Sequence, residues 1–216
     1  MKKTSIIYCL ITLLIVVINS RAQQVKSSSD CATNPPDFIH LSYEQANKAV
    51  NSEDDLISRG TKRICPEYIT NLVNQLRHEY LSNGNETLAI YLLGELRPSG
   101  SNAIEFLIAN IDFRTSKIEP NLHPARWRTY PAEDALMKIG KPVIDPILNH
   151  LSNEADTLRR RLMCEVLVKV EGKNGEFVNE VDGKVTAQNL IKRKLADESD
   201  PAKKANLEAA LKELEK

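Results

Sequence analysis

The stretch YITNLVNQL at Tyr68–Leu76 has two counterparts further along the chain, AIEFLIANI at Ala103–Ile111 and VIDPILNHL at Val143–Leu151. Apolar residues occupy positions 2, 5, 6 and 9 of all three nonapeptides. Spacings of three, four and seven residues place these side chains on one face of an α-helix. A weaker fourth copy, AQNLIKRKL at Ala187–Leu195, keeps the apolar residues at positions 5 and 9. The recurrence predicts a set of similar amphipathic helices.

A second pattern alternates with the first along the chain. It reads LAIYLLGEL at Leu88–Leu96, PAEDALMKI at Pro131–Ile139 and LMCEVLVKV at Leu162–Val170, and each copy ends Leu-x-x-apolar. A single helix pair leaves an apolar stripe uncovered, whereas stacked pairs bury a continuous core. The alternation therefore predicts an all-α fold, a short α-solenoid of antiparallel helix pairs that spans residues 41–216.

Two further stretches carry a family resemblance. RRLMCEVL at Arg160–Leu167 resembles the first helix of the HEAT-repeat family, in particular the short HEAT-like repeats of the phycobilin lyases. IGKPVIDPI at Ile139–Ile147 resembles the corner and second helix of such a repeat. The resemblance covers roughly Cys65–Leu195 and implies the fold, because the family serves many functions. Lyase activity is not expected here, because those lyases work in the cytoplasm and this chain has the leader described below.

Helix boundaries carry their own sequence signals. Ser42 followed by Gln45 three residues later predicts a capping box at the start of the first helix. Gly84 and Gly140 are both predicted to end helices, because glycine readily adopts the conformation found there. Asp200–Pro201 is predicted to open a final helix whose narrow apolar stripe suits a terminal cap.

The first 22 residues have the organisation of a signal peptide. Lys2 and Lys3 give a positive start, an apolar run covers residues 6–18, and the cut is expected after Ala22. A membrane-spanning helix needs about 20 residues, so the short run favours cleavage over a retained anchor. We therefore expect export to the periplasm or secretion, followed by a flexible polar lead-in over residues 23–40. The mature chain is expected to have no membrane segment.

Charge argues against nucleic acid as a partner. The sequence has 29 basic and 29 acidic residues, and loss of Lys2, Lys3 and Arg21 with the leader leaves 26 basic ones, a net charge of −3. Such a chain has no overall positive field that would attract a phosphate backbone.

Three cysteines remain after the leader. Cys31 and Cys65 are candidates for a disulfide in an oxidising compartment, although the sequence alone does not fix the pairing. Cys164 falls in an apolar stripe, where a buried thiol behaves as a small hydrophobe. We expect no metal site, because there is no CxxC and the four histidines are not at the spacings of metal ligands.

A long insertion interrupts the repeats at residues 112–130 and contains the only tryptophan of the chain. Long loops without regular structure are often functional, and Trp, Tyr and Arg dominate binding hot spots. The candidate partner-binding residues are Arg114, His123, Arg126, Trp127, Arg128 and Tyr130. The alternative is that Trp127 packs back onto the helices. A second insertion, residues 172–184, is expected to be a structural loop. The alternatives are a short hairpin packed on the stack and a disordered insert.

No catalytic motif stands out: zincin spacing, a nucleophile elbow and a phosphate loop are all missing from the sequence. The leading hypothesis is an exported, non-catalytic scaffold without a cofactor that binds a protein or peptide partner. One alternative is a small-ligand-binding protein or enzyme with a pocket under residues 112–130. Another is a structural component of the cell envelope.

Overall fold

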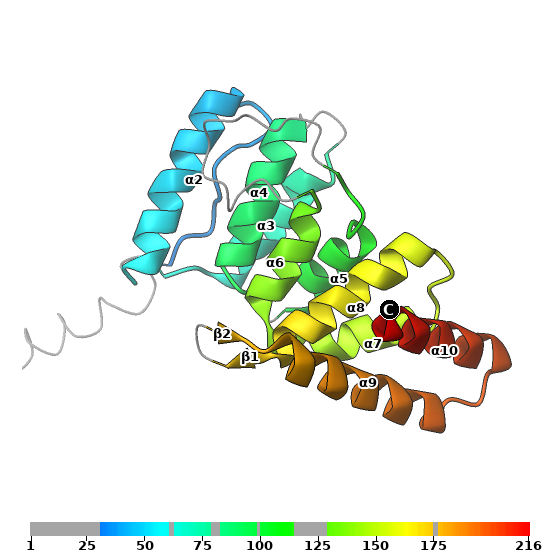
Figure 1. Ribbon diagram of the computed structural model, residues 1–216. Coiled ribbons are helices and arrows are strands. Elements are labelled where there is room, and N and C mark those ends of the chain that lie inside the picture. The colour runs from blue at the N-terminus through cyan, green and yellow to red at the C-terminus, as the bar shows by residue number, and fades with distance from the viewer. Residues whose placement is uncertain (1–30, 61–62, 79–82, 99, 115–128, 175–176) are drawn as a thin grey trace, which may run out of the picture.

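The computed structural model describes residues 31–60, 63–78, 83–98, 100–114, 129–174 and 177–216. These residues are almost wholly helical (Figure 1), which confirms the predicted all-α class. The α-helices are α2 (Tyr43–Ser58), α3 (Pro66–Leu76), α4 (Asn83–Glu95), α5 (Ser101–Ala109), α6 (Pro131–Ile139), α7 (Ile144–Leu151), α8 (Thr157–Glu171), α9 (Glu180–Asp197) and α10 (Pro201–Glu215). A 3-10 turn, η3 (Lys141–Val143), precedes α7.

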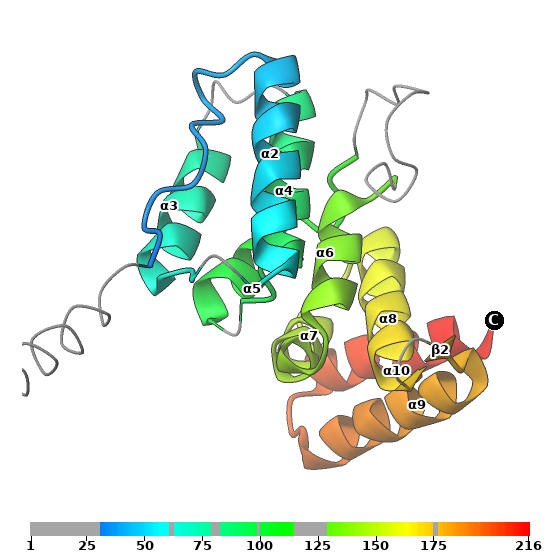
Figure 2. The same cartoon turned by 90° about the vertical axis from the view of Figure 1, so that its left-hand side faces the viewer.

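The helices lie in two rows around one core. α2, α4, α6 and α8 stand side by side, each in contact with the next (Figure 2). α3, α5 and α7 contact one another in the same order and form the second row. At the C-terminal end, α9 and α10 pack on α8 and α7. The second insertion contributes strands β1 (Lys173–Asn174) and β2 (Phe177–Val178), an antiparallel hairpin that leads into α9.

The predicted apolar stripe forms the centre of this core. Its buried members are Leu72, Val73, Leu76, Ile104, Leu107, Ile108, Ile111, Ile147, Leu148 and Leu151. Position 2 of the pattern is less uniform, because Ile69 and Ile144 are half-buried at the edge of the cluster. Burial of one such side chain is worth roughly 1.5–3 kcal/mol, so this stripe contributes substantially to fold stability.

Glycines set the spacing within the first row. A Cβ on Gly94 would lie 2.8 Å from the Cα of Ala135, so α4 and α6 approach at this point closer than any side chain allows. The prediction that Gly84 ends a helix is wrong, because Gly84 lies in the first turn of α4. A Cβ there would lie 2.6 Å from Cδ2 of Tyr43, so this glycine serves a close approach to α2 instead. Gly140 does end α6, with φ 81°.

Caps at both ends of the domain agree with the sequence signals. The Ser42 side chain accepts a hydrogen bond from the Gln45 N–H, and the Gln45 side chain accepts one from the Ser42 N–H. The Asp200 carboxylate accepts hydrogen bonds from the first backbone N–H groups of α10, and Pro201 is its first residue. Each cap is worth about 1 kcal/mol.

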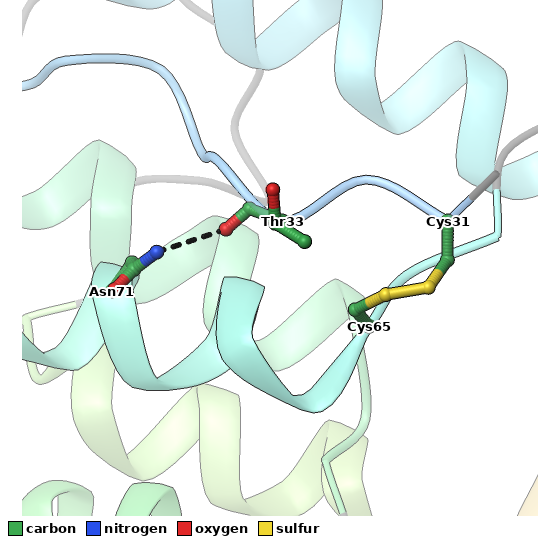
Figure 3. The surroundings of a disulfide bond; sticks show 4 residues. All are labelled: Cys31, Thr33, Cys65 and Asn71. Atoms are coloured by element: carbon green, nitrogen blue, oxygen red, sulfur yellow. Dashed lines mark hydrogen bonds between the residues drawn. A yellow bond between two sulfur atoms is a disulfide. The ribbon is translucent and has the colours of Figure 1, made fainter. Parts of the chain in front are cut away.

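Residues 31–41, here called the strap, run along α3 before α2 begins. Cys31 forms a disulfide with Cys65, with 5.3 Å between the Cα atoms, so the expected pair is present (Figure 3). The side chain of Asn71, six residues after Cys65 on α3, donates a hydrogen bond to the Thr33 carbonyl at 3.0 Å. The strap is therefore fixed to α3 by both a covalent and a polar contact.

The strap also contributes to the core. Phe38 is fully buried, and its N–H donates a hydrogen bond to Oε1 of Gln75 at 2.8 Å. The predicted flexible lead-in covers residues 23–40, but residues 31–40 pack as part of the helical domain; residues 23–30 lie outside the described residues. One buried aromatic side chain and its hydrogen bonds outweigh the polar composition of this segment.

Candidate functional site

The structure describes two of the six residues predicted to bind a partner. Arg114, which follows α5, places its guanidinium carbon 5.5 Å from the ring centroid of Tyr130, the residue before α6. This cation–π contact joins the two ends of the 112–130 insertion. The other four candidates, His123, Arg126, Trp127 and Arg128, lie outside the described residues.

A second arginine fixes the base of the insertion. Arg159 on α8 donates hydrogen bonds from Nη1 to Asp112 at 2.5 Å and from Nε to Glu154 at 2.9 Å. It also donates to the last carbonyls of α5, those of Ile108 at 3.1 Å and Ala109 at 3.0 Å. One side chain therefore caps α5 and ties it to α8.

The electrostatics of Arg159 agree with this role. Burial on its own would lower the pKa of the guanidinium, but the hydrogen bond with Glu154 and the attraction of Asp112 outweigh burial and raise it. Arg159 is thus a permanently charged structural clamp. Its donors are engaged within the fold, so it offers little to a ligand.

A different surface, the face of α3, α5 and α7, carries polar side chains that pair across helices. Three cross-helix pairs follow one another there. Arg77 donates to Asn102 at 3.3 Å, Nε2 of His150 lies 2.6 Å from Oε2 of Glu105, and Lys194 on α9 donates to Asn149 at 2.9 Å. We call these three pairs the polar ladder. Most of its members are solvent-exposed, so they retain free donors and acceptors.

A hollow of about 530 Å³ lies within the ladder. It is lined by Leu76, Arg77, Glu105, Phe106, Ala109, Asn110 and His150. The guanidinium carbon of Arg77 lies 5.9 Å from the centroid of the Phe106 ring, which is almost buried in the floor. Both signs of charge therefore meet beside an almost buried aromatic ring.

No group of three or more His, Cys, Asp or Glu side chains among the described residues is arranged to hold a metal ion. Burial raises the pKa of the Cys164 thiol to about 12, so this cysteine stays protonated and does not act as a nucleophile at neutral pH. Its Sγ, on α8, lies 3.7 Å from the carbonyl oxygen of Ala210 on α10.

The described helices also carry no candidate membrane span: each is either too short or too polar to cross a bilayer. Comparison of the chain with family models, curated proteins and solved structures finds no match.

The polar ladder is not among the sites that the sequence predicts. Arg77, Glu105 and His150 occupy ordinary polar positions beside the apolar stripe, where charged residues are common. The available signal was the repeat itself, because equivalent helices placed side by side bring their polar flanks together. The pairing of individual residues depends on how far each helix is shifted along its neighbour.

Proposed function

We propose that the mature chain is a short HEAT-like α-solenoid that binds an extended segment of a partner protein along the face of α3, α5 and α7. The arrangement in two rows supports the solenoid, because neighbours within each row are in contact and α4, α6 and α8 also contact α3, α5 and α7, respectively. The resemblance of Arg160–Leu167 and Ile139–Ile147 to HEAT repeats points the same way.

The polar ladder is the observation that carries the binding proposal. Its side chains link the C-terminal end of α3, α5, α7 and α9, so a ligand lying across these helices meets a series of fixed polar groups. Preorganised groups lower the entropy lost on binding. The hollow between Arg77 and His150 would accept one side chain of the bound segment.

Export belongs to the same proposal. The signal-peptide pattern of residues 1–22 predicts it, and the Cys31–Cys65 disulfide supports an oxidising compartment such as the periplasm or the extracellular space. The partner would then be a protein of the same compartment. We propose no catalytic role and no cofactor.

Selection from a random peptide library tests the proposal. Peptides that bind the wild-type chain should lose at least about tenfold in affinity for an Arg77→Ala/Glu105→Ala/His150→Ala variant, since hot-spot residues contribute more than 1 kcal/mol each. The matched variant is Arg126→Ala/Trp127→Ala/Arg128→Ala in the 112–130 insertion.

The two variants separate the possible outcomes. Loss of affinity only in the ladder variant supports the proposed face. Loss only in the insertion variant would move the site to residues 112–130. Failure to select any peptide would reject the scaffold proposal as a whole.

A further inference from the structure

A second hollow, of about 420 Å³, lies where α5 begins, on the same side of the molecule as the strap disulfide. Six apolar residues supply most of its wall: Ile64, Pro66, Ile69, Leu96, Pro98 and Ala103. We call it the α5 hollow. Its volume is within the range of small-ligand sites and is ample for one large apolar side chain.

Charge in the α5 hollow is one-sided. Arg97 lines it, and none of the described lining residues is acidic. The Arg97 guanidinium has no hydrogen bond or ion pair with any described residue. The nearest acid in sequence, Glu95, is already paired with Lys138 at 2.5 Å. The hollow therefore combines an apolar wall with one uncompensated positive charge.

The α5 hollow is continuous with the polar ladder. Asn102 lines the hollow, and its side-chain oxygen accepts the hydrogen bond from Arg77, which lines the ladder hollow. A ligand that lies along the ladder can therefore reach Arg97 without leaving the surface of α3 and α5. Arg77 adds a second positive charge on the path.

We infer that the α5 hollow binds the carboxyl-terminal end of the partner segment, with the last side chain apolar. This inference rests on the proposed peptide-binding function and names the part of the peptide that is recognised. The terminal carboxylate would pair with Arg97, and the last side chain would fill the apolar wall. An internal segment of a polypeptide has no carboxylate at its backbone and leaves Arg97 unpaired.

An acyl chain fits the hollow less well. The α5 hollow is open to solvent rather than an enclosed tunnel, so a long hydrocarbon chain would leave much of its length in water. Asn102 and Thr70 at its margin can instead hydrogen-bond to peptide groups. A peptide therefore suits both the apolar wall of the α5 hollow and the polar side chains of Thr70 and Asn102.

Titration with defined probes tests the inference on the full mature chain. The probes are N-acetyl-Gly-Gly-Leu with a free carboxylate, the same peptide as its amide, and octanoate. Methyl NMR signals of Ile64, Ile69 and Leu96 report on occupancy. We expect the carboxylate peptide to bind about tenfold more tightly than the amide, because a charge-assisted hydrogen bond is lost.

An Arg97→Gln variant supplies the decisive comparison. In it the carboxylate and amide peptides should bind equally, while Arg161→Gln, a change of an exposed arginine on α8, should keep the tenfold difference. Equal binding of both peptides to the wild-type chain, shifts at other methyl groups, or tighter binding of octanoate would each overturn the inference. If library peptides depend on the ladder but the carboxylate probe does not bind, the inference alone fails and the proposed function stands.

Discussion

Two arginines near opposite ends of α5 have opposite surroundings. At the C-terminal end, Arg159 makes four hydrogen bonds that join α5, α8 and the base of the 112–130 insertion. At the N-terminal end, Arg97 has no described partner and lines an apolar hollow. Arg159 is half-buried and uses its donors within the fold, whereas Arg97 is exposed and its donors are open to a ligand. The same residue type thus has a structural role at one site and a binding role at the other.

The largest expected effect is on the structural arginine. Arg159→Ala should lower the free energy of unfolding by about 2–4 kcal/mol, because Glu154 and the last carbonyls of α5 lose their partner in a partly buried setting. Urea denaturation followed by circular dichroism measures the change. The matched control is Arg161→Ala, which removes a 3.5 Å pair with Glu165 on the exposed side of the same helix.

The control should change stability by less than about 0.5 kcal/mol, as exposed ion pairs usually do. Equal effects of the two alanine substitutions would contradict the clamp assigned to Arg159. The difference between the two changes in unfolding free energy measures how much more an arginine stabilises the fold when it is half-buried and its donors are hydrogen-bonded.

A smaller effect on stability is expected at the contact between α4 and α6. α4 leads into Arg97 and α6 follows Tyr130, and Gly94 allows these helices to touch. Gly94→Ala would place a Cβ 2.8 Å from backbone Cα of Ala135, so we expect a loss of about 1–3 kcal/mol from overpacking.

Gly100→Ala is the matched control for that change. A Cβ on Gly100 meets nothing within 4 Å, and its φ of −77° is open to any residue. Thermal unfolding of both variants provides the comparison. A Gly94 variant as stable as the Gly100 variant would show that the two helices separate at little cost.

The elements that the sequence could predict are those whose signal is local. The apolar stripe repeats within a single helix, so its burial follows from the helical period. The capping box at Ser42 is likewise complete within four residues. The all-α class follows from signals of this kind. The Cys31–Cys65 pair does not, because its members are 34 residues apart and the sequence made them only candidates for a disulfide.

The features that could not be predicted from the sequence depend on contacts between residues far apart in the chain. The role of Gly84 is an example: the ring that requires a glycine there belongs to Tyr43, 41 positions earlier in the sequence. A prediction from neighbouring residues therefore puts Gly84 at a helix end. The His150–Glu105 pair spans 45 positions, and no local pattern defines which polar residue faces which. Burial of Phe38 was hidden in the same way, because the segment around it is polar.

The smallest expected effect has the opposite sign and concerns Arg97. Its φ of 45° is the only positive value at a non-glycine residue among those described, and proline follows it. This conformation costs a residue with a side chain about 1–2 kcal/mol, a cost that glycine avoids. Glycine also makes the unfolded chain more flexible, which offsets part of that gain in stability. We therefore expect Arg97→Gly to be about 0.5–1 kcal/mol more stable than Arg97→Ala in parallel urea titrations. Equal stability of the two variants would mean that the strain at Arg97 is relieved by its surroundings. If the glycine variant is also more stable than the wild-type chain, the fold retains a strained arginine at the α5 hollow at a cost in stability. That is expected where binding rather than folding requires the side chain.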